Sequence, residues 1–74
     1  MVRIFIDSTK RTVNLRAPGS TLVADVQDTI EHRWGRAVCA QRLICSIRIP
    51  LFSRVFIARI RIENIHPLTI KIHL

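Results

Sequence analysis

Hydrophobic and polar residues alternate at both ends of the chain, and this spacing predicts β-strands. Residues 2–7 and 12–16 show a two-residue period, and the polar stretch 8–10 separates them. Side chains along a strand point alternately to opposite faces, so each stretch would bury one face. The two stretches predict an antiparallel hairpin with its turn at 8–10. Residues 68–74 show the clearest alternation in the chain and predict a final strand.

A helical period follows the hairpin. Apolar residues recur every four positions over 22–34, which would place them on one face of a helix. Ser20 and Thr21 precede this stretch and are of the residue types that cap helix N-termini. Gly35 follows it and suits a left-handed C-cap. We therefore predict one helix over 22–34.

The middle of the chain gives shorter signals. Residues 43–45 predict a short strand, and 47–49 predict another that Pro50 would end. Two interpretations stay open for the segment that follows. Alternation at 59–62 is typical of a strand, whereas a bent loop would tuck Phe56 and Ile60 inward.

The order of these elements indicates the fold class. A hairpin, a helix, short strands and a last strand in a chain of 74 residues predict a single α+β domain over 1–74. We expect a mixed sheet with one face covered by the helix, and a last strand that pairs in parallel with the first.

Composition adds a strong positive charge to this picture. Twelve lysines and arginines face five acids, for a net charge of +7, and only Lys10 and Lys71 are lysine. Arginine forms bidentate hydrogen bonds to phosphate, which favours a polyanionic partner such as RNA. The alternative is a solvated basic surface without a partner. With an aromatic content of 5%, we expect any RNA contact to be made through phosphates.

Few residues suggest catalytic or metal chemistry. Cys39 and Cys45 lack a second pair at metal-ligand spacing, so we expect two reduced, partly buried thiols in an intracellular protein. Asp25 and Asp28 are spaced as on a solvated helix face, and Trp34 is expected to pack at the helix end. We predict no enzyme activity, no cofactor and no metal.

Targeting signals are also missing from the pattern. The apolar start ends at Asp7, too soon for a signal peptide, and the later apolar stretch 55–62 contains two arginines. We therefore expect a cytoplasmic, monomeric protein that does not span a membrane.

Several strings resemble the ubiquitin family. They are Met1 with Ile4-Phe5-Ile6, then Gln41-Arg42-Leu43-Ile44, and Leu68 to Leu74. The resemblance covers the whole chain and is concentrated at core positions. It implies a ubiquitin-like β-grasp roll, and it specifies a fold more firmly than a function.

The departures from the family bear on conjugation. Conjugated members end in a flexible Gly-Gly tail, whereas no glycine follows Gly35 here. If the chain ends at Leu74, the resemblance implies a domain that is not conjugated; in a longer polypeptide, the residues after Leu74 would decide this. Of the lysines that would extend a ubiquitin chain, only Lys10 lies near a family acceptor position.

The family's recognition patch is altered as well. Ile44 matches the isoleucine at its centre, next to Arg42. Ser8 or Thr9 takes the place of an apolar first-loop residue, and Lys71 takes the place of a last-strand valine. Because polar and charged groups replace two apolar contributors, we expect weakened binding to ubiquitin receptors.

The family also suggests a function. Ubiquitin-like domains occur as N-terminal fusions to ribosomal proteins, so we expect a folding or assembly aid, or a structural module, beside the rRNA of the small ribosomal subunit. The alternative is a free interaction module or divergent modifier. The cations expected to contact RNA phosphates lie in predicted loops and strand ends: Arg11, Arg16, Arg48, Arg54, Arg59 and Arg61.

Overall fold

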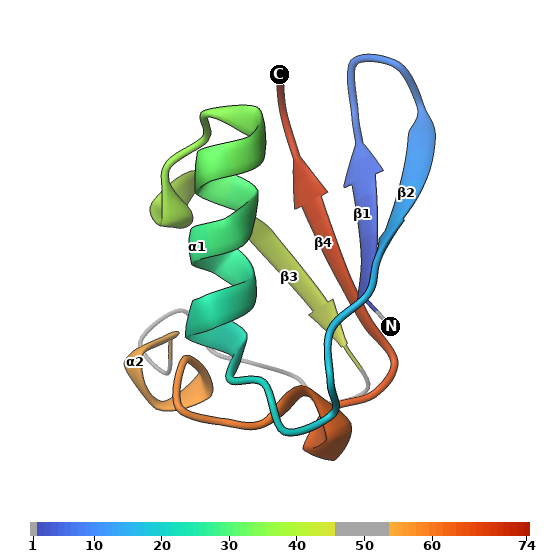
Figure 1. Cartoon of the computed structure of the whole chain (residues 1–74). Helices are drawn as coiled ribbons and strands as arrows, with labels where there is room; N and C mark the ends of the chain where they lie inside the picture. The colour runs from blue at the N-terminus through green and yellow to red at the C-terminus, as the bar shows by residue number, and fades with distance from the viewer. Residues whose placement is uncertain (1, 46–53) are drawn as a thin grey trace.

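A four-stranded sheet and one main helix make up the fold (Figure 1). The computed structural model describes residues 2–45 and 54–74. In chain order the elements are β1 (Val2–Ile6), β2 (Arg11–Leu15), α1 (Val23–Trp34), the 3-10 helix η1 (Val38–Ala40), β3 (Arg42–Cys45), α2 (Arg54–Ile57), the 3-10 helix η3 (Ile62–Asn64) and β4 (Leu68–Ile72). The predicted strand at 47–49 lies outside the described residues.

The two terminal strands lie side by side at the centre of the sheet. The strand order is β2-β1-β4-β3, with β1 antiparallel to β2, β4 parallel to β1, and β3 antiparallel to β4. A parallel pair needs a long crossover connection, which α1 and the segments around it supply. The predicted hairpin, the mixed sheet and the parallel pairing of first and last strands are confirmed. The fold is α+β, with the layout of a ubiquitin-like β-grasp roll.

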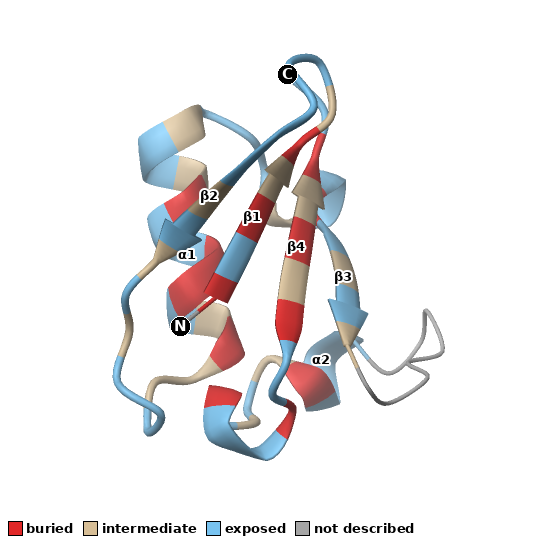
Figure 2. Ribbon diagram, turned by 90° about the vertical axis from the view of Figure 1, so that its right-hand side faces the viewer, coloured by how far each residue is buried: buried red, intermediate tan, exposed pale blue. Residues whose placement is uncertain are grey.

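The core lies between α1 and one face of the sheet. In Figure 2, buried residues alternate with less buried ones along β1 and β4, with α1 behind the sheet. Inward strand positions join the buried side of the helix and the segment before β4. The buried apolar residues are Val2, Ile4, Ile6, Val23, Val26, Ile30, Ile57, Ile62, Ile65, Leu68, Ile70 and Ile72.

The start of the helix differs from the prediction. The N-cap residue is Leu22, without a side-chain cap, and not Ser20 or Thr21. The first two helical N–H groups donate instead to the backbone carbonyls of Ile60 and Ala58, at 2.9 and 3.0 Å. Because a distant segment accepts these bonds, the helix end needs no capping hydroxyl.

The end of the helix agrees with the prediction. Gly35 has a φ of 67°, in the left-handed region, and its N–H donates to the carbonyl of Glu31 at 2.8 Å. Downstream, the buried side chain of Gln41 ties β3 to the helix. Its Nε2 donates to the carbonyls of Gln27 and Arg36 at 3.0 and 3.2 Å.

The segment after α2 is a bent loop, and the alternative of a strand over 59–62 is wrong. Among its described residues, an isolated β-bridge joins Arg61 to Leu22, through hydrogen bonds from the N–H of Val23 to the carbonyl of Ile60 and from the N–H of Ile62 to the carbonyl of Thr21. Ile60 is half-buried, as the loop interpretation expected.

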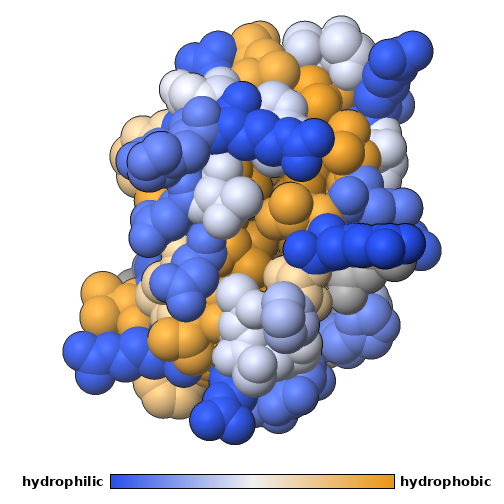
Figure 3. All heavy atoms as spheres, viewed as in Figure 1, coloured by the Kyte–Doolittle hydropathy of each residue, from blue (hydrophilic) through white to orange (hydrophobic). Residues whose placement is uncertain are grey.

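Phe56, however, does not tuck inward. Its side chain is 69% exposed, Val55 beside it is 73% exposed, and Ile57 of the same short helix is buried in their place. The space-filling view shows apolar atoms at the surface over α2 (Figure 3).

Within the described part of the chain, no helix is long and apolar enough to cross a membrane.

Candidate functional site

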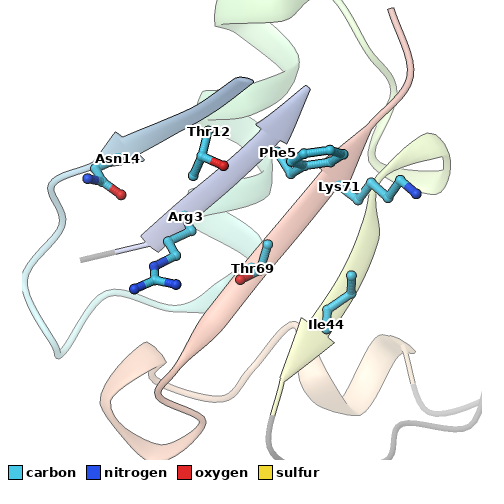
Figure 4. Close-up of a pocket in the computed structure, with 7 residues that line it drawn as sticks. All are labelled: Arg3, Phe5, Thr12, Asn14, Ile44, Thr69 and Lys71. Atoms are coloured by element: carbon cyan, nitrogen blue, oxygen red, sulfur yellow. The ribbon is translucent and has the colours of Figure 1, made fainter. Parts of the chain in front are cut away.

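The face of the sheet turned away from α1 carries a mixed set of polar, basic and apolar side chains. Strand register arranges them in two rows that run across all four strands. One row is Asn14, Arg3, Thr69 and Ile44, and the next is Thr12, Phe5, Lys71 and Arg42. We call these eight residues the open face. Seven of them, all except Arg42, line one shallow hollow (Figure 4).

The local sequence explains this face. Val2, Ile4 and Ile6 point into the core, so Arg3 and Phe5 between them must point outward. Figure 4 shows both side chains on the side of β1 away from the helix, with Thr69 and Lys71 of β4 beside them.

A charged cluster bounds the open face at the hairpin end. Lys71 Nζ lies 5.7 Å from the centroid of the Phe5 ring and 3.6 Å from Asp7 Oδ1. Lys10 Nζ donates to the same oxygen at 3.1 Å, and His73 Nδ1 lies 2.9 Å from Asp7 Oδ2. The hydrogen bond from Lys10 is the main cause that lowers the pKa of Asp7. His73 and Lys71 act in the same direction, and desolvation opposes them.

The predicted recognition patch is brought together in part. Arg42 pairs in register with Lys71, and Ile44, which is 49% exposed, pairs with Thr69. Ser8 lies in the hairpin turn next to Asp7 and does not line the hollow that Ile44 and Lys71 share.

Lys10, the predicted acceptor lysine, lies in the same turn. It has a φ of 55° and an exposed side chain whose amine is bonded to Asp7.

The predicted phosphate contacts do not gather on one face. Arg11 opens β2 in register with the inward-facing Ile6, and Arg16 follows the end of that strand. Arg54, in α2, donates from Nη1 to the carbonyl of Cys39 at 3.1 Å. The remaining two described members, Arg59 and Arg61, belong to the loop after α2, and Arg48 lies outside the described residues. All five described members are exposed.

Arginine charge is not neutralised within the described part of the molecule. Ten arginines less Arg48 leave nine that the structure describes, and all nine are exposed. The salt bridges among residues 2–45 and 54–74 all converge on Asp7, and their partners are Lys10, Lys71 and His73. None of these nine guanidinium groups is paired with a carboxylate, so each remains available to an external anion.

Sequence patterns missed five members of the open face. Arg3, Phe5, Thr12, Asn14 and Thr69 were identified as strand residues but not as neighbours. Their signal was the outward position in each alternating strand. Which outward residues meet depends on register between strands that are distant in the sequence.

The remaining residues that the sequence analysis considered for binding or chemistry are the tryptophan and the two cysteines. Trp34 packs against the core as predicted, with Arg33 lying 4.9 Å from its ring centroid. Cys45 is partly buried, as predicted for both cysteines, whereas Cys39 is exposed because it lies in the surface turn η1. No group of three or more metal-ligand side chains occurs among the residues that the structure describes.

The open face therefore presents hydrogen-bond donors, three cations and two apolar side chains on one side of the sheet. Side chains of these kinds can form a binding surface. No protein-family model matches the chain, and a search of curated proteins finds no similar sequence.

Proposed function

We propose that this chain is a non-conjugated ubiquitin-like binding module that docks on RNA phosphates as part of the small ribosomal subunit. In this role it would be fused to a ribosomal protein and would aid its folding or assembly. One observation supports the proposal above all others. The nine described arginines are exposed and none is paired with a carboxylate.

This observation distinguishes between two uses of charge. A basic surface that served only the fold would pair its guanidinium groups with the available acids. Asp25 and Asp28 are exposed on α1, yet neither forms a salt bridge with a residue that the structure describes. Arginine that is not paired with a carboxylate in the folded protein can form bidentate bonds to phosphate without first breaking a salt bridge.

Salt dependence of RNA binding tests the phosphate part of the proposal. We expect the purified chain to bind a fluorescently labelled stem-loop of small-subunit rRNA, measured by anisotropy between 50 and 200 mM KCl. Neutralising three phosphates of a duplex gives a slope of log K against log salt of about −2.7, by analogy with DNA. Absence of binding at 50 mM KCl, or an affinity that salt does not change, would refute phosphate docking.

Sedimentation tests the ribosomal part separately. The full polypeptide should co-sediment with purified small subunits at low salt. If it binds rRNA in solution but never enters the small-subunit peak, the ribosomal assignment is wrong and phosphate docking stands.

A second function is favoured by one feature of the open face. Ile44, at the place of the family's central patch residue, is 49% exposed on the edge strand β3. A free interaction module could use it to bind a ubiquitin receptor. Chemical-shift changes centred on Ile44 upon addition of a receptor domain, and their loss in Ile44→Ala, would support this function over RNA docking.

A further inference from the structure

We infer that the open face is a site for single-stranded RNA, with one base against Phe5 and flanking phosphates at Arg3 and Arg42. This inference rests on the proposed function, because it names the surface and the class of RNA that the module would bind. Three features of the open face support it.

The first feature is the spacing of the cations. Arg3 and Arg42 are two strands and two residues apart, which places their Cα atoms roughly 12 Å from each other. Both side chains are exposed, and neither forms a salt bridge among the residues that the structure describes. At this distance they would contact different phosphates of one strand, with Lys71 between them in the middle of the sheet.

The second feature is the exposed side of the aromatic ring. Phe5 is half-buried and lies in the row between Thr12 and Lys71. The Lys71 ammonium lies 5.7 Å from the ring centroid, and Phe5 and Lys71 both line the hollow of the open face (Figure 4). A base could lie against the ring, because the Lys71 ammonium is 3.6 Å from Asp7 Oδ1, a long contact, and could turn to a phosphate. Aromatic stacking of this kind tolerates any base, and one stacked base would add to the phosphate contacts that the low aromatic content of the sequence predicts.

The third feature favours RNA over an acidic protein. Only two of the eight open-face residues, Phe5 and Ile44, are apolar, which is too few for the desolvated centre of a protein interface. Thr12, Asn14 and Thr69 surround them with hydroxyl and amide groups that can hydrogen-bond ribose and base edges.

Matched double variants test the site. The probe is a labelled ten-nucleotide oligouridylate, and binding is measured by anisotropy over a range of KCl concentrations. We expect Arg3→Gln with Arg42→Gln to reduce the salt slope by about 1.4, which is two phosphate contacts on a single strand. The control is Arg33→Gln with Arg36→Gln, which removes the same charge at the C-terminal end of α1 and should leave the slope unchanged.

Stacking is tested from the side of the ligand, so that it does not depend on the folding of a variant. An abasic oligonucleotide of the same length should bind the wild-type chain about tenfold more weakly than oligouridylate, since it keeps phosphates but lacks bases. Phe5→Leu should reduce the affinity for oligouridylate by a similar factor without changing the salt slope.

The outcomes separate the two proposals. If both double variants lose the same slope, RNA binding is diffuse, so the open-face site is wrong while the proposed function stands. If the wild-type chain binds no RNA at low salt, both are wrong. If abasic and uridine strands bind alike, or polyglutamate displaces RNA at equal charge, the site is not one for single-stranded RNA.

Discussion

Replacing Ile70 by alanine would test which face of the sheet is buried. Ile70 is fully buried in the central strand β4, in register with Ile4 on one side and Leu43 on the other. Buried Ile→Ala substitutions cost about 2–5 kcal/mol, because they remove apolar contacts and leave a cavity. A domain of 74 residues has a total stability of about 4–11 kcal/mol. We therefore expect Ile70→Ala to remove about half of the free energy of unfolding.

The matched control lies on the neighbouring strand. Ile44 in β3 is 49% exposed on the opposite face, and its replacement by alanine should cost about 1 kcal/mol or less. Urea denaturation at 25 °C, followed by far-UV circular dichroism, measures both variants. In thermal melts Ile70→Ala should lower the midpoint by roughly 10 °C or more. Equal losses for the two variants would refute the assignment of faces, since a slip of one residue in strand register exchanges inward and outward side chains.

Three other predictions concern single contacts. Because the pKa of Asp7 is lowered in the folded protein, its contribution to stability is complete above about pH 4 and is lost as pH falls through the folded-state pKa. In urea titrations between pH 5 and 2, the stability of Asp7→Asn should therefore decline less than that of the wild-type chain. Parallel curves of stability against pH for the two proteins would contradict this. Gly35→Ala should lower the free energy of unfolding by about 1 kcal/mol, measured in a thermal melt. The cause is the left-handed backbone alone, because an added Cβ meets nothing within 4 Å. A decrease above about 3 kcal/mol would reveal a steric clash. Gln41→Ala should lower the free energy of unfolding by about 2–3 kcal/mol in urea denaturation, because it removes two hydrogen bonds and leaves a cavity. An unchanged free energy of unfolding would show that the Nε2 contacts do not hold β3 to the helix.

Local periodicity predicted most of the fold. The alternation at 2–7 and 68–74 identified both central strands and their inward residues, since the face of a strand residue depends only on its place in the two-residue period. Gly35 marked the helix end for an equally local reason, because its backbone needs a positive φ.

Long-range backbone contacts explain what the sequence did not predict. The helix begins after Leu22 without a side-chain cap because carbonyls near Ile60 accept its first hydrogen bonds, and no local signal reveals that pairing. In the short helix α2 before this loop, Ile57 is buried and Phe56 is exposed, which the sequence did not predict.

The candidate site was less predictable than the fold. Ile44, Arg42 and Lys71 could be selected from a resemblance, but Arg3 joins them through the parallel pairing of β1 with β4. That contact links residues at opposite ends of the chain, and it becomes visible only when the register is known.

Charge connects the fold of this protein with its proposed partner. Eleven described lysines and arginines face five acids, and only Asp7 forms salt bridges among the residues that the structure describes. Like charges at this density repel one another and oppose the compact state. A polyanion that binds the folded chain alone would remove part of this repulsion and add stability, by about 2.7 kcal/mol at a concentration one hundred times its Kd. Against a total of about 4–11 kcal/mol, that gain is large. In the proposed function, RNA is therefore both the ligand of the basic surface and a stabiliser of the fold that carries it.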